Sequence, residues 1–317
     1  MLCKLKPGIG YQLVHMGKEC LMASAVNTVE GTPDQVGAML VPRGLNALAC
    51  SGALPKGIML TLTLPETVGE PDFRKMMQAI DQDCQREHIE VFGGHTQVSS
   101  GVSRVIASVT AVGICPALKK EGDGAAPGGS MAAAGQMRPV AGQDIVMTKW
   151  AGLSGTWLIH QQCRQAFIEK YNRDLSDAIE HMKEFFCVCR EAAVARDFGV
   201  QYMLDLSVTG VFGGLWEAAS AGNVGLCVEL KHIPIRQETV ELCDFVDVNP
   251  YLIPSMGAML MASWHGSALV SRLKRAGIEA AVIGSFTQGN DRVIVNEDEV
   301  RYLDMPRASI MEGIRMP

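Results

Sequence analysis

The residues best suited to chemistry lie near the middle of the chain, in the glycine-containing segment from Thr148 to Thr156. A short apolar run precedes this segment and a helical pattern follows it, so we expect a connection from a strand to a helix. Such a connection can direct backbone N–H groups and a helix N-terminus at one anion, and Lys149 would add a positive charge. An ordinary connection between two core elements is the alternative, because the Gly-Lys-Ser/Thr end of a Walker A loop is missing. The candidate phosphate-binding residues here are Thr148, Lys149, Gly152, Ser154, Gly155 and Thr156.

A second candidate group, Gly93-Gly94-His95-Thr96, follows the apolar residues of a strand pattern over residues 89–98. Glycines at the end of a strand let the backbone approach a phosphate, and His95 and Thr96 carry side-chain hydrogen-bond donors. His95 is also a candidate general acid or base. A turn that only ends a strand is the alternative interpretation. His160 has no neighbour at metal-ligand spacing and is expected at the surface or at an interface.

A third candidate group lies at the end of the strand-like residues 202–206 and in the loop after them. Asp205 offers a carboxylate, the ligand type that Mg²⁺ prefers. Ser207 and Gly210 follow it in a loop before a helix expected over residues 215–221. Glu217 either faces the same cation or simply lies on that helix. Asp205 is therefore the candidate metal ligand of this region.

Helical and strand patterns mix in both halves of the chain without strict alternation, which predicts an α+β fold. A long helix is expected over residues 175–198 and a hairpin over 292–303, and Pro42 is expected to kink or break a helix over 34–51. Residues 119–143 are rich in Gly and Ala and have no pattern, which is typical of a linker. We therefore expect one domain over residues 1–118 and a second over 144–317.

The composition excludes some classes of function. A net charge of −6 and the absence of a basic run argue against a general nucleic-acid binder. No apolar run has signal-peptide or membrane-spanning length, so we expect a cytoplasmic protein without membrane contacts. The ten cysteines are scattered, and in a reducing compartment we expect them to be small buried residues.

Five stretches of the chain resemble one known family and occur in that family's order. They are Leu48 to Pro55, Gly93 to Thr96, Met147 to Thr156, Asp205 to Glu217, and Ser255 to Leu260. On these stretches the sequence resembles the aminoimidazole ribonucleotide (AIR) synthetase superfamily. It is most similar to the AIR synthase-related branch that includes the hydrogenase-maturation carbamoyl dehydratase. The resemblance extends over about residues 19–290, which is most of the chain.

The resemblance implies an amino-terminal α/β domain that pairs with its twin through a shared β-barrel, and a carboxy-terminal α+β domain. It implies a homodimer that binds ATP and Mg²⁺, with carboxylates and glycine loops around the phosphates. Members of the family activate an amide or similar oxygen by phosphorylation, or transfer phosphate, and convert ATP to ADP. Such chemistry depends mainly on positioning and on charge neutralisation.

The sequence departs from the family pattern at the expected metal ligands. Asn27 stands where the family has an aspartate, and Asn46-Ala47 stands where it has Asn-Asp. Asp205 is retained, and Ser207 replaces a threonine with the same hydroxyl function. The resemblance therefore implies metal ligands at Asp205 and Asn27, nucleotide contacts at Asn27 and Asn46, and a partly degenerate Mg²⁺ site.

Two hypotheses of function follow. In the first, the protein is a ligase-like or kinase-like enzyme that transfers phosphate from ATP to an unknown small molecule, with His95 and Asp205 as catalytic residues. In the second, it is a non-catalytic dimeric paralogue that binds a nucleotide, another ligand or a protein partner. The replaced aspartates favour the second hypothesis, and the glycine segments of the carboxy-terminal half favour the first. The carbamoyl dehydratase carries its substrate on a C-terminal cysteine, and no cysteine follows Cys243, so that specific activity is disfavoured.

Overall fold

The computed structural model describes residues 10–15, 21–115, 138–305, 311 and 314. The described residues form two compact units, one within residues 9–135 and one within residues 136–317. We call them the amino-terminal unit and the carboxy-terminal unit and describe each by itself. Most of the expected linker over 119–143 lies outside the described residues, so its bounds stay a prediction.

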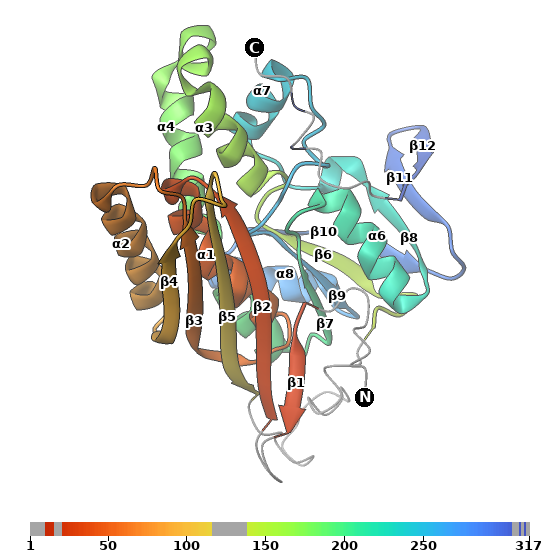
Figure 1. Cartoon of the computed structure of the whole chain (residues 1–317). Coiled ribbons are helices and arrows are strands. Elements are labelled where there is room, and N and C mark those ends of the chain that lie inside the picture. Colours follow the sequence, from red (N-terminus) through yellow and green to blue (C-terminus); the bar gives the residue numbers. More distant parts are fainter. Residues whose placement is uncertain (1–9, 16–20, 116–137, 306–310, 312–313, 315–317) are drawn as a thin grey trace. The chain divides into compact units, whose positions relative to one another are not determined.

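The amino-terminal unit is a five-stranded sheet with two helices on one face (Figure 1). The strands pair in the order β1-β2-β5-β3-β4, and only β3 and β4 are parallel. The elements are β1 (Gln12–His15), β2 (Leu21–Gly31), α1 (Pro33–Ala49), β3 (Leu54–Leu64), α2 (Glu70–Arg86), β4 (Glu90–Val98) and β5 (Val105–Cys115).

Helix α1 packs on the centre of this sheet because its sequence supplies both a defined start and a close contact. Thr32 and Gln35 form a capping box, and Pro33 occupies the first turn, where its missing N–H costs nothing. A Cβ at Gly44 would lie only 2.8 Å from a methyl group of Val109 on β5. The helix continues through Pro42, so the predicted break does not occur there, and the alternative of a kink stays a prediction.

The carboxy-terminal unit is a seven-stranded sheet in the order β12-β11-β8-β10-β6-β9-β7, with only β8 and β11 parallel. Its strands are β6 (Asp144–Thr148), β7 (Tyr202–Asp205), β8 (Gly225–Glu229), β9 (Met259–Ser263), β10 (Ala280–Thr287), β11 (Arg292–Asn296) and β12 (Glu299–Tyr302). Its helices are α3 (Leu153–Lys170), α4 (Arg173–His181), α5 (Cys189–Phe198), α6 (Gly210–Gly222), α7 (Gln237–Phe245) and α8 (Gly266–Arg275).

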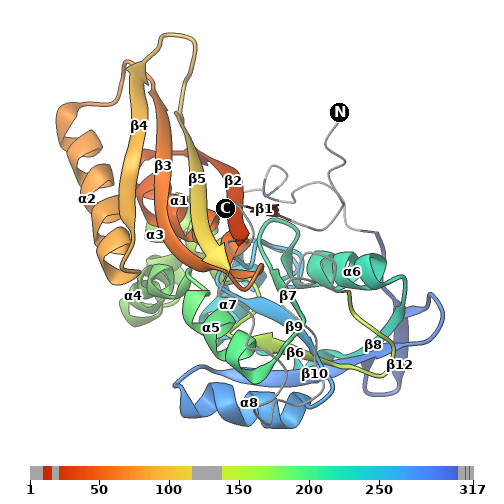
Figure 2. The same cartoon turned by 90° about the horizontal axis from the view of Figure 1, so that it is seen from below.

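The core of this unit explains why its central strands are continuously apolar. All five residues of β9 are buried, as are four of the five in β6. Helix α6 packs on one side through Val211 and Leu215, and α8 packs on the other through Leu269 and Leu273 (Figure 2). A strand covered on both faces has no solvent side, so alternation is lost.

The α+β class predicted from the sequence is confirmed, but three element boundaries are not. The long helix expected over 175–198 is α4, a 3₁₀ turn (Met182–Phe185) and α5. Helix α6 begins at Gly210, five residues before its expected start. The hairpin expected over 292–303, in contrast, is present as β11 and β12. Strand β4 runs through Gly93 and Gly94 instead of ending on them. No helix of the described residues is long and apolar enough to cross a membrane.

Candidate functional site

A short segment of the carboxy-terminal unit, Ile253–Met256, joins two of the predicted glycine segments. The hydroxyl of Ser255 accepts a hydrogen bond from the Gly152 N–H at 2.8 Å. The backbone N–H of Ser255 donates to the carbonyl of Ser207 at 3.0 Å. Ser255 is fully buried, so these bonds fix the two segments relative to each other.

The segment around Gly152 is closely packed on the Ile253–Met256 segment. The N–H of Gly155 donates to the carbonyl of Pro254 at 2.7 Å, and the Ser154 hydroxyl accepts from the N–H of Met256 at 3.0 Å. Gly152 has a φ of +71°, and a Cβ at Gly155 would lie 2.8 Å from that of Ile253. These glycines are therefore explained by close packing between two loops.

The hydroxyls of Thr148 and Thr156 also form hydrogen bonds in the interior of the unit. Thr148 is fully buried, and its hydroxyl accepts a hydrogen bond from the N–H of Met259 on the neighbouring strand at 3.2 Å. The hydroxyl of Thr156 donates to that of Thr239 at 3.1 Å, and both threonines are fully buried. The structure therefore gives each of these side chains a partner within the fold.

Lys149 is a buried cation with a complete set of partners. Its Nζ donates to the carbonyls of Phe185 and Cys187, both at 2.7 Å, and pairs with the Glu191 carboxylate at 2.8 Å. A lysine ammonium has three donors, and these contacts use all three. Only 6% of the residue is exposed. A contact from Lys149 to a phosphate would require one of these bonds to break.

Asp205 and Ser207 lie at the end of β7, directly before α6. Both residues are partly exposed, in contrast to the buried segment around Gly152. The N–H of Leu206 donates to the carbonyl of Ala258 at 3.0 Å, which holds the chain between them. Glu217 lies seven residues into α6, where burial raises the pKa of its carboxyl. The structure thus places Asp205 at a strand end, within reach of solvent and close in the chain to a helix start.

Helix α6 starts where it does because Gly210 allows an unusually close contact. Gly210 has a φ of +65°, and a Cβ there would lie 2.6 Å from the backbone oxygen of Tyr251 and 2.7 Å from that of Ile253. The N–H of Phe212 donates to the same Tyr251 oxygen at 3.2 Å. The rings of Phe212 and Tyr251 are stacked, with centroids 5.2 Å apart and an angle of 15°.

A cavity of about 940 Å³ opens beside the start of α6. Its walls come from residues 208–213, residues 247–252 and the β11–β12 hairpin with the residues that follow it. Val208 and Thr209, which directly follow Ser207, belong to this lining. The described part of the carboxy-terminal unit therefore places a cavity next in the chain to Asp205 and Ser207.

In the amino-terminal unit, Asn27 and Asn46 lie on the helix-covered side of the sheet. Asn27 on β2 pairs with Val109 on β5, and its side chain shares a face with the buried Ala25 and Val29. Its Nδ2 is buried and has no hydrogen-bond partner among the described residues. Asn46 is fully buried on α1.

Gly93 to Thr96 lie within the edge strand β4, contrary to the expected strand-ending loop. Gly94 is opposite Leu60 and His95 is opposite Thr61 on β3. A Cβ at Gly94 would overlap the backbone oxygen of Leu60, so close strand pairing explains this glycine. Thr61 is exposed on the helix-free face, so His95 shares that face and Asn27 lies on the other.

The structure therefore brings some of the predicted site residues together and leaves others apart. It joins Gly152, Ser154 and Gly155 to Ser207 and Gly210 through a segment that sequence reasoning did not select. The signal was present, because Ser255 begins one of the five family-like stretches. No local sequence pattern indicated that Phe212 and Tyr251 stack, because these residues are 39 positions apart in the chain.

Comparison with known families decides what this architecture is. The model of the AIR synthase related protein, N-terminal domain, matches residues 11–115, and that of the C-terminal domain matches residues 140–296. The chain belongs to the AIR synthase related protein family. The predicted family and its two-domain fold are confirmed, with the sheet of the amino-terminal unit open in the described residues.

Relatives within this fold carry out different reactions. Carbamoyl dehydratase HypE of Rhodobacter capsulatus is 23% identical, over 82% of this chain and 72% of its own. A hydrogenase maturation protein HypE in complex with ATP has a TM-score of 0.68 at 18% identity, covering 95% of this chain and 88% of that one. Thiamine monophosphate kinase from Aquifex aeolicus has a TM-score of 0.67 at 14% identity, covering 92% of both chains. The fold alone does not select among such reactions.

Proposed function

We propose that the protein binds ATP and transfers its terminal phosphate to a small molecule. The observation that carries this proposal is the Asp205–Gly210 connection, where a partly exposed carboxylate and hydroxyl directly precede a helix start. The HypE structure of the same fold contains ATP, which supports a nucleotide as the ligand. Phosphoryl transfer needs positioning and charge neutralisation more than covalent participation by the protein.

Mg²⁺ is the cation that this chemistry implies, and the residues fit it in part. The Asp205 carboxylate is a hard oxygen ligand of the kind that Mg²⁺ prefers. Asn27 has a buried amide nitrogen without a partner among the described residues, which suits a phosphate oxygen. With its amide turned over, the same position would present an oxygen to a cation. At the Asp205 carboxylate, Mg²⁺ would neutralise charge on the phosphates, and Ala47 would contribute no ligand.

The other predicted site residues remain proposals with different kinds of support. We propose that the segment from Thr148 to Thr156 acts mainly by holding Ser255, which in turn supports Ser207. Direct phosphate contacts from this segment and from Gly93 to Thr96, and a catalytic role for His95, stay predictions. A reducing, cytoplasmic location is likewise proposed, and the free thiols of the described cysteines support it.

We also propose a homodimer that forms through the helix-free face of the amino-terminal sheet. That face exposes large apolar side chains, including Val26 at 66% and Phe92 at 52%. Met59 and Ile106 lie on the same face of neighbouring strands and are also exposed. Contiguous apolar surface of this kind is typical of an interaction site, and a second copy offers a matching face.

The alternative is a non-catalytic paralogue that keeps nucleotide or ligand binding. The observation that favours it is the replacement of two family carboxylates by Asn27 and Ala47. The HypE–HypF complex, which has the same fold in one component, supports a protein as the partner in such a role.

The experiment that tests the proposal is thermal unfolding with ATP, with and without Mg²⁺. Ligand binding to the folded state at about one hundred times Kd contributes roughly 2.7 kcal/mol. We expect a Mg²⁺-dependent rise in Tm of several degrees, lost in Asp205→Asn and kept in Asp298→Asn, an exposed control. A rise without Mg²⁺ dependence would support the paralogue. No rise at millimolar ATP would overturn nucleotide binding altogether.

A further inference from the structure

We propose that the cavity beside the start of α6 binds a flat, positively charged small molecule. This is a second binding site of the carboxy-terminal unit, and it does not depend on nucleotide binding. Three features of the cavity carry the inference: its size, its aromatic wall and the charge of its lining.

The size of the cavity suits a small ligand. Its volume of about 940 Å³ lies at the upper end of the roughly 300–1,000 Å³ that is typical of small-molecule sites. Three separate parts of the unit form its walls, so a bound molecule would contact an α6 turn, a loop and a hairpin together.

The aromatic wall favours a flat ligand. Phe212 and Tyr251 both line the cavity, and their rings are stacked with only 15° between their planes. Both are partly exposed, and a planar ring can extend such a stack. Tyr302 adds a third, exposed ring to the lining.

The wall is held in place before any ligand binds. Gly210 brings α6 against the backbone of Tyr251, and the Phe212 N–H donates to the Tyr251 carbonyl at 3.2 Å. The side chain of Asn249 accepts from the N–H of Tyr251 at 2.9 Å. A pre-formed wall spares a ligand much of the entropy cost of ordering the site.

The charge of the lining favours a cation. Asp247 and Asp304 are exposed and line the cavity, and neither forms an ion pair within the described residues. Arg301 also lines it, but its guanidinium binds both carboxylate oxygens of Glu299 at 2.8 and 2.9 Å. Among the described lining residues the uncompensated charge is therefore negative, which disfavours phosphates and attracts a positively charged group.

The test uses three probes that separate shape from charge: benzamidine, which is flat and cationic; benzoate, which is flat and anionic; and cyclohexylamine, which is cationic but not flat. Binding to the full chain is measured by ligand-observed NMR titration. We expect saturable binding of benzamidine, with both other probes roughly tenfold weaker or more, a difference of about 1.4 kcal/mol. The double variant Asp247→Asn/Asp304→Asn should weaken benzamidine by a similar factor.

Two controls keep the result interpretable. Asp244→Asn removes an exposed carboxylate outside the lining and should leave benzamidine binding unchanged. The ATP-dependent rise in Tm is recorded for every variant, so loss of benzamidine binding with the ATP effect intact concerns the cavity alone. Benzoate binding as tight as benzamidine, or benzamidine binding that is indifferent to the double variant, would overturn the proposal. So would the absence of saturable benzamidine binding at millimolar concentration.

Discussion

At the scale of single residues, Lys149 illustrates how a charged side chain can belong to the structure. Its ammonium links three points on a segment about forty residues later in the chain, Phe185, Cys187 and Glu191. Removing one partner of a buried ion pair leaves an uncompensated charge, which costs far more than the pair itself is worth.

We therefore expect Lys149→Met to lower the free energy of unfolding by about 3–5 kcal/mol, because Glu191 stays buried without its partner. Lys149→Met combined with Glu191→Gln should recover part of that loss. Lys183→Met, at an exposed position, serves as the control. Chemical denaturation compares these variants with the wild type. A loss below about 1 kcal/mol for the single variant would contradict the buried pair.

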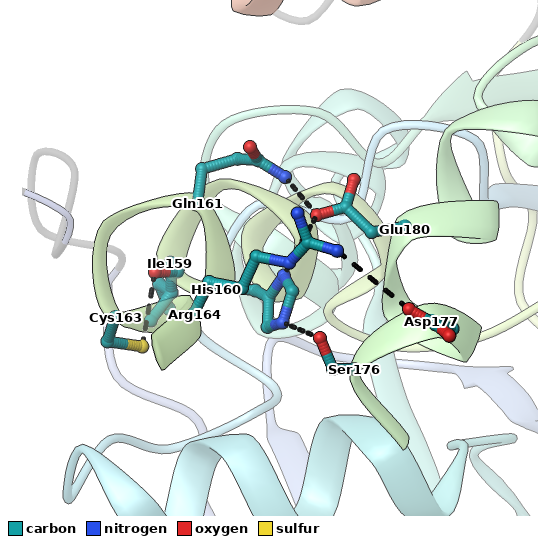
Figure 3. Close-up of polar contacts among 8 residues, drawn as sticks. All are labelled: Ile159, His160, Gln161, Cys163, Arg164, Ser176, Asp177 and Glu180. Atoms are coloured by element: carbon teal, nitrogen blue, oxygen red, sulfur yellow. Dashed lines mark hydrogen bonds and ion pairs between the residues drawn. The ribbon is translucent and has the colours of Figure 1, made fainter. Parts of the chain in front are cut away.

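His160 is fully buried, so the expected surface or interface position is wrong within this unit. Its Nε2 is 3.0 Å from the Ser176 hydroxyl, and its Nδ1 is 3.3 Å from Glu180 Oε1, an ion-pair distance without hydrogen-bond geometry (Figure 3). Contact with His160 is the main cause that lowers the pKa of Glu180 to about 2, with burial acting against it. Gln161 and Arg164 add to the lowering.

A carboxyl with a depressed pKa stabilises the fold most above its ordinary pKa. The contribution of Glu180 should thus be complete above about pH 4.5 and should disappear as the pH falls toward 2. Glu180→Gln should lower the free energy of unfolding at pH 7 by roughly 1–2 kcal/mol and should flatten its decline in acid. Glu184→Gln, from the exposed pair with His181, should change neither. Equal acid slopes in Glu180→Gln and the wild type would contradict this assignment.

At the scale of elements, the start of α6 depends on one glycine. Gly210 has a left-handed backbone, and backbone oxygens lie 2.6 and 2.7 Å from the position that a Cβ would occupy. A side chain there therefore meets two obstacles at once. The obstacles are backbone atoms, which cannot rotate away as a side chain can. The contact also sets the aromatic wall of the cavity.

Gly210→Ala should therefore destabilise the protein by more than the roughly 1–2 kcal/mol that a left-handed alanine costs alone. Gly199→Ala supplies that reference, because Gly199 has a φ of +90° with nothing within 4 Å of an added Cβ. Thermal and chemical unfolding compare the two. Equal losses in both variants would mean that the 249–253 loop moves freely and that α6 is not fixed by this contact.

At the scale of the whole molecule, the apolar face of the amino-terminal sheet bears on the association state. Val26 lies on β2, inside the sheet order, and is 66% exposed on the face that no helix covers. A stable interface buries at least about 1,000 Å², which a sheet face of this kind can supply.

Val26→Asp should convert the proposed dimer to a monomer, because an unpaired charge would be buried within its interface. Val300→Asp introduces the same charge at an exposed position of β12, in the carboxy-terminal unit, and should leave the dimer intact. Light scattering after size exclusion gives the mass of each. A monomeric wild type at micromolar concentration would refute the proposed dimer.

The sequence by itself determined the features that depend on local patterns and on ordered motifs. The strand-like composition of β2 and β5, the apolar run of β6 and the hairpin over 292–303 follow from short-range sequence patterns. The family followed from five stretches in order, and the family models confirm it. Residue types therefore indicated which segments matter and what chemistry they offer.

Only the tertiary structure decided how these groups are used within the fold. The N–H groups of Lys149 Nζ and Gly152 donate hydrogen bonds to residues that are far away in the chain. Gly94 allows β4 to pair closely with β3. Asp205 is partly exposed at a strand end, next in the chain to the lining of a cavity. A residue's type fixes how many hydrogen bonds it can form, but contacts between distant segments fix which side chains a ligand can reach.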